Sequence, residues 1–262
     1  MTCNLAKRLL AAGLVAVIAL GAGGCYTETA PEPADAPKPD PGKTAEPAQA
    51  DTIGPTQTDA APPEPAEKTD SKYLDQENAP RGEGWIALCN GRDLEGWHPR
   101  QEDRPTSWKV ASGVMVNTTS RSKRGTNIVT DQKFRDFEIY CEYRIPKGSS
   151  SGVFLRGRYE IQIADDHGRR PSSRGSGALY GLSSPAKNAS RRAGQWQSLY
   201  ARIAGRKVTI VLNGVKTVDN AEARRPTSGH LDNNVDQPGP IMIQGDRGAI
   251  EVRHLMLKPI EG

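Results

Sequence analysis

Apolar and polar residues alternate along most of the chain after residue 80, which is the pattern of β-strands with one buried side and one solvent-facing side. The clearest example is the segment 137–145, where Phe137, Ile139, Cys141 and Tyr143 occupy alternate positions. No segment of this region shows a sustained apolar stripe at the 3.6-residue spacing of a helix. The pattern therefore predicts an all-β domain with little helix.

Further strands are predicted where similar short runs are bounded by Gly, Pro, Asn or Ser. They are residues 85–89, 108–116, 127–130, 152–156, 158–164, 178–181, 196–204, 207–212, 215–218, 240–244 and 250–257. Asn213 and Gly214 lie between two of these runs, and a type I′ turn needs positive φ at both central residues, so they predict a hairpin over 207–218. Many short strands joined by Gly- and Ser-rich loops are typical of an antiparallel β-sandwich of jelly-roll type.

The first 24 residues have the three parts of an export signal: basic Lys7 and Arg8, an apolar run over 9–20 and small residues over 21–24. The apolar run is about a dozen residues long, whereas a membrane-spanning helix needs ~20. Cys25 follows directly, which resembles the lipobox of bacterial lipoproteins, in which the thiol receives a diacylglycerol. We therefore expect a lipoprotein signal over 1–24, lipidation at Cys25 and a membrane anchor in the cell envelope, on the periplasmic or outer-membrane face. Ordinary cleavage near Cys25 is the alternative.

Residues 25–80 predict a disordered linker that holds a folded domain, residues 81–262, away from the membrane. This segment is rich in Pro, Ala and acidic residues and has too few apolar side chains to offset the entropy of ordering. Its net charge is −8, so the domain carries about +10 within a chain of net charge +4. A basic domain favours an acidic partner, such as an anionic polysaccharide or phospholipid headgroups. Export from the cytoplasm argues against nucleic acid.

Only two of the four cysteines can remain as thiols in the mature domain. Cys3 leaves with the signal and Cys25 is the lipidation candidate, which leaves Cys89 and Cys141 on apolar strand faces. Free thiols that pack as small hydrophobic groups are favoured, and a disulfide in the oxidising envelope is the alternative.

Several motifs of the domain resemble, in order and spacing, the 3-keto-disaccharide hydrolase domain family. The first is Leu88-Cys89-Asn90-Gly91-Arg92-Asp93-Leu94-Glu95-Gly96-Trp97. The later ones are Asp136-Phe137-Glu138, Ser151-Gly152-Val153-Phe154-Leu155-Arg156, Tyr159-Glu160-Ile161-Gln162-Ile163, Gly177-Ala178-Leu179-Tyr180, Asn188-Ala189-Ser190, Gly194-Gln195-Trp196, Leu212-Asn213-Gly214 and Ile243-Gln244-Gly245-Asp246. The resemblance covers nearly all of residues 83–260 and implies a concanavalin-like β-sandwich that acts on 3-keto-glycosides.

The chain departs from the family pattern in two residues and two loops. Cys89 replaces an aromatic residue, which is a change in packing. Arg247 stands beside Asp246 where the family commonly has His, which puts catalytic activity in doubt. The insertions 169–176 and 229–237 are loops particular to this chain.

Cleavage of a 3-keto-glycoside needs a base near C2, a donor at the C3 oxygen and an acid near the glycosidic oxygen. Glu160 is the candidate base, or the acceptor for a sugar hydroxyl. Arg156, at the end of the preceding strand, is the candidate donor to the keto oxygen, and Asp246 is expected in the same cleft. The alternative for Glu160 and Arg156 is a cross-strand ion pair on a wet face, worth under ~1 kcal/mol.

Five further residues are candidate substrate-binding groups. Gln162 shares a strand face with Glu160, and Asp165 lies where that strand leaves the sheet. Tyr180, Asn188 and Trp196 come from later segments as a stacking platform and polar clamps, although Trp residues more often belong to the core.

The run Asp165-Asp166-His167-Gly168 contains enough oxygen and nitrogen ligands for a divalent cation such as Ca²⁺. Its spacing matches no defined metal loop, and a solvated loop is the favoured interpretation, so no metal ligand is assigned. Single histidines such as His254 are expected to be structural.

Three functions remain open. The first is an envelope enzyme that cleaves 3-keto-glucosides or related glycosides. The second is a non-catalytic carbohydrate-binding domain of the same fold, and the third is a surface scaffold. An enzyme should gather charged side chains in one pocket, whereas a lectin site should be shallow and aromatic and a scaffold should have no pocket.

Overall fold

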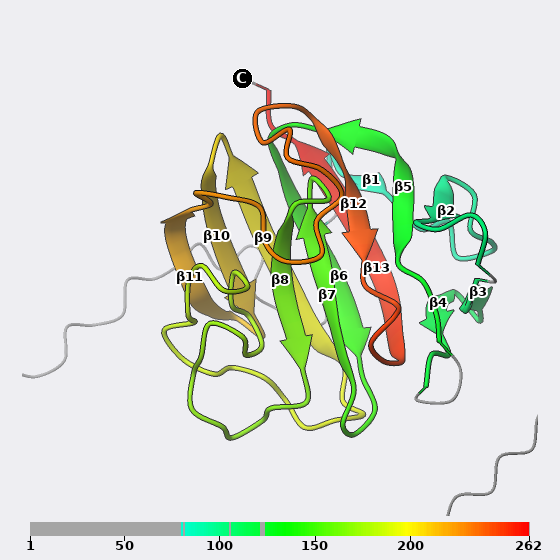
Figure 1. The fold of residues 1–262 in the computed structure, drawn as a ribbon, viewed down its shortest axis with the longest axis horizontal. Coiled ribbons are helices and arrows are strands. Elements are labelled where there is room, and N and C mark those ends of the chain that lie inside the picture. Colours follow the sequence, from blue (N-terminus) through cyan, green and yellow to red (C-terminus); the bar gives the residue numbers. More distant parts are fainter. Residues whose placement is uncertain (1–79, 81, 105, 121–123, 262) are drawn as a thin grey trace, which may run out of the picture. The chain divides into compact units, whose positions relative to one another are not determined.

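The computed structural model describes residues 80, 82–104, 106–120 and 124–261 (Figure 1). The export signal, Cys25 and the linker up to residue 79 lie outside the described residues. Within the described ranges the chain forms strands, turns and loops, and it contains no helix long and apolar enough to cross a membrane. The prediction of an all-β domain is confirmed.

Thirteen strands occur in the described part of the chain. They are β1 (Ile86–Ala87), β2 (Trp97–Pro99), β3 (Trp108–Ala111), β4 (Val114–Asn117), β5 (Ile128–Phe134), β6 (Phe137–Arg144), β7 (Ser150–Leu155), β8 (Tyr159–Ala164), β9 (Gln197–Ala204), β10 (Lys207–Leu212), β11 (Val215–Glu222), β12 (Gly239–Ile243) and β13 (Ile250–Pro259).

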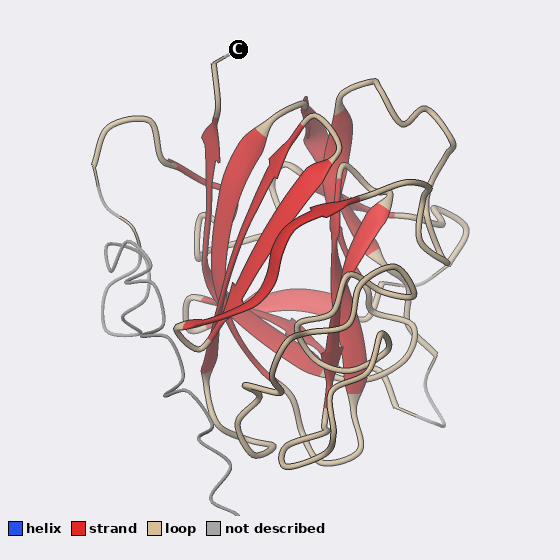
Figure 2. Ribbon diagram, turned by 90° about the vertical axis from the view of Figure 1, so that its left-hand side faces the viewer, coloured by secondary structure: helices blue, strands red, loops and turns tan. Residues whose placement is uncertain are grey.

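These strands form two sheets in which neighbouring strands run antiparallel. One sheet has the order β11-β10-β9-β6-β13-β4-β3, with β1 paired to β13, and the other has the order β2-β5-β12-β7-β8. Figure 2 shows the two sheets as separate layers joined by loops. The sheets form an antiparallel β-sandwich of the concanavalin-like, jelly-roll type, as the sequence predicts.

The core lies between the inward faces of the two sheets. Alternating side chains of β6 (Phe137, Ile139, Cys141 and Tyr143) belong to one core cluster together with Tyr159, Ile161 and Ile163 of β8. Because side chains alternate across a strand, Glu160 and Gln162 of β8 point away from this core. The outer face of the five-stranded sheet therefore receives the polar residues of that strand.

The hairpin predicted at Asn213-Gly214 is confirmed. Strands β10 and β11 pair directly at Leu212 and Val215, and both turn residues have positive φ, 50° at Asn213 and 78° at Gly214. These angles are the ones a type I′ turn requires. The Asn213 amide also donates to the carbonyl oxygen of Ala189 at 2.8 Å, so the turn holds the preceding loop.

Two predicted strands differ from the structure, and one strand was not predicted. The single strand predicted over 108–116 is a hairpin, because Ser112 and Gly113 adopt φ of 51° and 79° and form a turn between β3 and β4. Residues 178–181 form no regular strand, and Leu179 makes only isolated bridges to Ile161 and Ser183. Strand β2 has three residues, too few to produce a recognisable alternation.

Cys89 and Cys141 are both free thiols. Burial raises the pKa of the Cys141 thiol to about 12, and desolvation also raises the pKa of Cys89. Both side chains pack as apolar groups against the same core cluster.

Candidate active site

A cavity of about 550 Å³ opens on the outer face of the five-stranded sheet. Strand β8 supplies Glu160 and Gln162 to it, and the segment after β12 supplies Asp246 and Arg247. The full lining is Arg100, Asn127, Ser150, Glu160, Gln162, Ala164, Arg174, Tyr180, Ser228, Gly229, Gln244, Asp246 and Arg247. The cavity thus gathers two carboxylates and three guanidinium groups from separate parts of the chain.

The Glu160 side chain is buried at the base of this cavity, with 4% of its surface exposed. Within the described part of the chain its carboxylate has no hydrogen-bond or ion-pair partner. Its cross-strand neighbour on β7 is Phe154, which is fully buried. A buried carboxylate beside an apolar ring and without a donor is costly to ionise.

The backbone holds Glu160 in this position. Its amide donates to Thr227 Oγ1 at 2.9 Å, and its carbonyl oxygen accepts from the Tyr180 amide at 2.9 Å. The side chain lies over Gly152, where an added Cβ would come within 2.4 Å of Glu160 Oε1. The absence of a side chain at residue 152 therefore makes the space that the carboxylate occupies.

Burial, and after it the negative charge of Asp246, raise the pKa of Glu160 to about 7. The positive charge of Arg247 opposes this shift. A group that is partly ionised at neutral pH can both accept and return a proton, which is the property of a general base or acid.

Gln162 and Tyr180, two of the candidate substrate-binding residues, also line this cavity. The Gln162 amide donates to Ser150 Oγ at 3.1 Å and to the carbonyl oxygen of Ile163 at 3.0 Å, which fixes its orientation. Tyr180 is placed by its backbone bond to Glu160 and supplies the aromatic ring of the lining.

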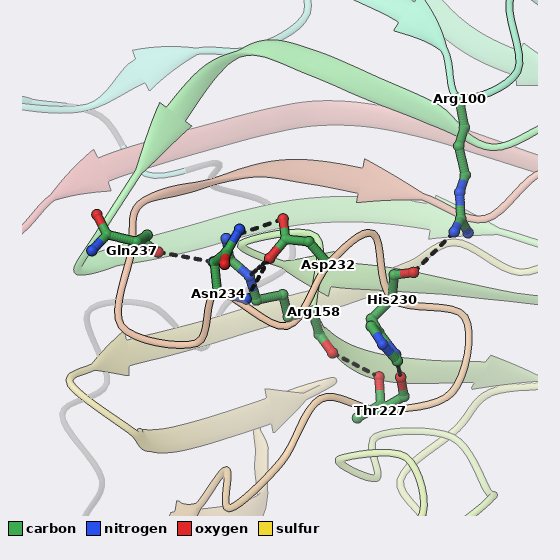
Figure 3. Close-up of polar contacts among 7 residues, drawn as sticks. All are labelled: Arg100, Arg158, Thr227, His230, Asp232, Asn234 and Gln237. Atoms are coloured by element: carbon green, nitrogen blue, oxygen red, sulfur yellow. Dashed lines mark hydrogen bonds and ion pairs between the residues drawn. The ribbon is translucent and has the colours of Figure 1, made fainter.

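The loop over residues 223–238 forms one wall of the cavity, through Ser228 and Gly229. Arg100, which also lines the cavity, donates to the carbonyl oxygen of Gly229 at 2.7 Å. It also donates to the carbonyl oxygen of His230 at 2.9 Å (Figure 3). Thr227 Oγ1 donates to the carbonyl oxygen of Arg158 at 3.0 Å while it accepts from Glu160. The wall and the buried carboxylate are therefore joined by direct hydrogen bonds.

Arg158 anchors the loop over residues 223–238 through contacts with two of its residues. Its side chain is 2% exposed, and its Nε lies 2.6 Å from Asp232 Oδ1. It also donates to the carbonyl oxygen of Gln237 at 2.8 Å (Figure 3). The hydrogen bond from Arg158 is the main cause that lowers the pKa of Asp232. Leu231 completes the anchor by packing against the apolar cluster of Phe154, Val129 and Met242.

The structure does not bring Arg156 to the cavity. Its guanidinium is buried near the turn between β7 and β8, where it donates to the carbonyl oxygens of Arg135 and Gly205 and pairs with Asp136 at 2.5 Å. Arg156 adopts a positive φ of 54° in this turn. The alternative ion pair between Glu160 and Arg156 is equally absent from the described contacts.

Asp165 and Asn188 also lie outside the Glu160 cavity. Asp165 Oδ2 accepts from the Gly148 amide at 2.8 Å. The Asn188 amide donates to the carbonyl oxygens of Asp166 at 2.7 Å and Arg169 at 3.1 Å. Both residues hold loops in place because their polar atoms are already bonded within the chain.

The run Asp165-Asp166-His167-Gly168 does not fit a Ca²⁺ site in this geometry. Asp166 uses one carboxylate oxygen for the Ser176 amide and the other for Ser190 Oγ. Calcium requires six to eight convergent oxygen ligands, and the described residues contain no group of three or more acidic, His or Cys side chains placed to hold a metal.

Trp196 lies with the eight-stranded sheet and not at the cavity. The guanidinium groups of Arg144 and Arg253 lie 4.8 and 4.1 Å from its ring centroid. These two arginines pair in turn with Glu251 and Glu142. The ring faces are therefore used by cation–π contacts within the protein.

Sequence reasoning missed several lining residues, among them Gln244, Asn127, Arg100 and Arg174. Gln244 could have been found from the alternation of β12, because Ile241 and Ile243 point into the core. Asn127 directly precedes β5 and Arg100 directly follows β2. The alternation of apolar and polar residues did not locate the ends of these two strands. Arg174 lies in an insertion with no periodic signal.

The fold and the cavity together define a concanavalin-like β-sandwich with a charged site on the outer face of its smaller sheet. The profile of the 3-keto-α-glucoside-1,2-lyase-like domain matches residues 84–258, and the chain belongs to this family.

Relatives of known sequence or structure agree with this assignment. A 3-keto-disaccharide hydrolase of Bacteroides thetaiotaomicron is 27% identical over 92 residues, which are 33% of this chain and 31% of that protein. The chain thus matches about a third of the length of this relative. A crystal structure from Parabacteroides distasonis, of a protein assigned provisionally to the glycosyl hydrolases, is 25% identical with a TM-score of 0.55 and covers 68% of this chain and 84% of that one. A second such structure from the same organism is 20% identical with a TM-score of 0.57, covers 68% and 95% of the two chains, and supports the fold alone.

Proposed function

We propose that the protein cleaves 3-keto-glucosides, including 3-keto-disaccharides, by removing the proton at C2 and releasing the substituent at C1. Membership of the family and the relative named as a 3-keto-disaccharide hydrolase support this class of substrate. The observation that carries the proposal is Glu160, a buried carboxylate without a partner in the described part of the chain, with a pKa of about 7, at the base of an open cavity.

The chemistry follows from the ketone of the substrate. A carbonyl at C3 acidifies the hydrogen on C2, because the electron pair left behind delocalises into the ketone as an enolate. Glu160 accepts that proton. Collapse of the enolate forms the C1–C2 double bond and breaks the bond from C1 to its oxygen substituent. The departing oxygen takes a proton from solvent, which reaches the cavity at its exposed rim, and later addition of water across the double bond completes a net hydrolysis.

Two charged residues at the rim have complementary roles in this proposal. Asp246 makes Glu160 a stronger base, because its negative charge raises the pKa of that carboxyl. The positive charge of Arg247 acts on Glu160. In this proposal the Arg247 guanidinium, and not that of Arg156, stabilises the negative charge on the enolate oxygen. Gln162 and Tyr180 hold the sugar ring against the sheet through hydrogen bonds and ring contact.

We also propose that the domain is tethered in the cell envelope. The export signal over 1–24 and Cys25 after its small residues support lipidation, and the acidic, Pro-rich linker supports a spacer between the membrane and the domain. One acyl chain binds membranes weakly, whereas a diacylglycerol anchors stably.

The test is release of sugar from a panel of 3-keto-disaccharides and the corresponding unoxidised disaccharides by the purified protein. We expect cleavage of the keto compounds only. Glu160→Gln keeps the size of the side chain and removes the base, so we expect kcat/KM to fall by ~10²-fold or more. Glu222→Gln is the matched control, because Glu222 is exposed on β11 of the other sheet and its loss removes the same charge.

The competing function is a carbohydrate-binding domain without turnover. The replacement of the family's His by Arg247 favours this alternative, and Arg247→His is therefore the companion variant. If neither the parent protein nor Arg247→His cleaves any 3-keto-glycoside while sugars still bind, the binding function replaces the enzymatic one.

A further inference from the structure

The loop over residues 165–177, which contains an insertion particular to this chain, carries three arginines beside the Glu160 cavity. Arg169, Arg170 and Arg174 are all exposed. The loop backbone is nevertheless well anchored, because Asp166 accepts from the Ser176 amide at 2.8 Å and from Ser190 Oγ at 2.9 Å. The three arginines therefore lie on a loop whose backbone is held by hydrogen bonds.

A second cavity of about 360 Å³ lies against this loop. Its lining is Gly148, Ser149, Ala164, Asp165, Asp166, Arg169, Arg170, Ser172, Arg174 and Gly175. Ala164 and Arg174 also line the Glu160 cavity, so the two cavities adjoin. A ligand with two linked sugar rings can therefore occupy one cavity with each ring.

These arginines differ from four other arginines of the domain, which pair with carboxylates. Arg144, Arg156, Arg158 and Arg253 each pair with a carboxylate at 2.5 to 2.7 Å. In the described ranges, by contrast, no ion pair involves Arg169, Arg170, Arg174 or Arg247.

Two carboxylates, Asp165 and Asp166, line this cavity together with the three arginines, so its lining keeps a net formal charge of +1 (three positive and two negative groups). The carboxylates of Asp165 and Asp166 are hydrogen-bonded by backbone amides and a serine, as described above. Guanidinium groups form paired, charge-assisted hydrogen bonds with carboxylate and sulfate oxygens. In the described ranges no carboxylate pairs with these arginines, so their donors are available to an oxyanion of a ligand.

We propose that the second cavity is a subsite for a sugar that bears an oxyanion, either a carboxylate or a sulfate, linked to the ring held at Glu160. The inference rests on the proposed function for the sugar-binding role of the Glu160 cavity, and it narrows the substrate class to acidic glycosides. Arg174, which touches both cavities, is the residue that selects the anionic group.

Binding measurements test this subsite without requiring turnover. Isothermal titration of the purified protein compares trigalacturonate as the carboxylate probe, a sulfated carrageenan tetrasaccharide as the sulfate probe and maltotriose as the neutral probe. At an ionic strength of about 0.01 M, where the Debye length is about 30 Å, we expect at least one acidic probe to bind ~10-fold or more tightly than maltotriose. Arg174→Gln should weaken that binding ~5-fold, because it removes a charged donor, and should weaken the binding of maltotriose by a smaller factor.

The control is Arg202→Gln, which removes the same charge from an exposed position on β9 of the other sheet. It should leave the affinity for the acidic probe unchanged. Equal binding of acidic and neutral probes would overturn the subsite, and so would an equal loss in Arg174→Gln and Arg202→Gln. Binding to phosphatidylglycerol vesicles that depends on Arg174, without binding of any saccharide, would assign the loop to a lipid surface and also overturn it.

Different results would overturn the acidic-sugar subsite and the proposed enzymatic function. Arg174-dependent binding of an acidic saccharide without cleavage of any keto compound would retain the subsite and remove the enzymatic function. Cleavage of neutral 3-keto-disaccharides with no preference for acidic ones would do the opposite.

Discussion

Gly152 on β7 and Glu160 on β8 lie so close that a Cβ atom on residue 152 would be 2.4 Å from Glu160 Oε1 and 2.7 Å from its Cγ. Real Cβ atoms do not approach other atoms this closely, so the glutamate and the glycine depend on each other. Gly152 lies in strand β7 and is not one of the glycines with positive φ, so alanine can adopt its backbone conformation. The glycine is therefore required by space and not by backbone geometry.

Gly152→Ala is predicted to displace the Glu160 carboxylate. We expect a loss of stability of about 1–3 kcal/mol, typical of overpacking in a buried site, and a fall in kcat/KM of ~10-fold or more. Urea unfolding and steady-state kinetics measure the two effects.

A double-mutant cycle separates this contact from general damage to the strand. A Glu160→Ala background lacks the three atoms nearest to the added Cβ, so Gly152→Ala should cost less stability there. The same loss in both backgrounds would contradict the proposed contact.

The pKa of Glu160 predicts opposite pH dependences for stability and activity. The folded-state pKa of about 7 is above the ordinary value of 4.5, so the folded state binds more protons between these values. Stability should therefore fall as pH rises from about 4.5 to about 7, whereas activity should rise as the base ionises. Glu160→Gln should remove the stability change, which thermal unfolding at several pH values measures.

Two neighbouring charges should move the acidic limb of the activity profile in opposite directions. Asp246→Asn removes a negative charge that raises the pKa of Glu160, so the limb should shift to lower pH. Arg247→Gln removes a positive charge that lowers it, so the limb should shift to higher pH. Profiles of kcat/KM against pH for both variants check the signs. Shifts in the same direction would show that these charges do not act on Glu160.

Asp232→Asn is predicted to destabilise the loop over 223–238, because it leaves the buried Arg158 guanidinium without its counter-charge. The expected loss is about 2–4 kcal/mol, lower than for a fully buried pair because 36% of the Asp232 side chain is exposed. Because the pKa of Asp232 is lowered, its stabilising effect is present at neutral pH and is lost as pH falls below 3.8.

Asp236→Asn is the matched control in the same loop. Asp236 pairs with Arg206 at 3.2 Å, and both side chains are largely exposed, so the change should cost under ~1 kcal/mol. Chemical unfolding of both variants at pH 7 makes the comparison. A larger loss in Asp236→Asn than in Asp232→Asn would show that Arg158 is not the anchor of the loop.

Cys25→Ser is predicted to release the protein from membranes into the soluble fraction. Thioether lipidation needs the thiol, and the linker has almost no apolar surface that could bind a bilayer. Fractionation of cells followed by detection of the domain measures the distribution. Continued membrane association of the serine variant would show that another feature anchors the chain.

The amino-acid sequence by itself determined the fold class and the face on which the site lies. The alternation in 137–145 and 158–164 depends only on which side chains are apolar, and that choice decides which face of each strand is buried. The turn at Asn213-Gly214 was equally local, since positive φ at two adjacent positions restricts the residue types. Glu160 and Gln162 were found on the outer face for the same reason.

Only the tertiary structure decided which distant residues meet Glu160. Arg100 and Arg174 reach the cavity through strand pairing and loop anchoring, which depend on contacts far apart in the chain, whereas Asp246 was expected there from the family resemblance. Arg156 was misplaced because the turn after β7 directs its side chain toward Asp136, and Trp196 was misplaced because it is packed between two arginines of the other sheet. Strand periodicity specifies a face, but the position of a side chain along and between the sheets follows from register, turn geometry and competing ion pairs.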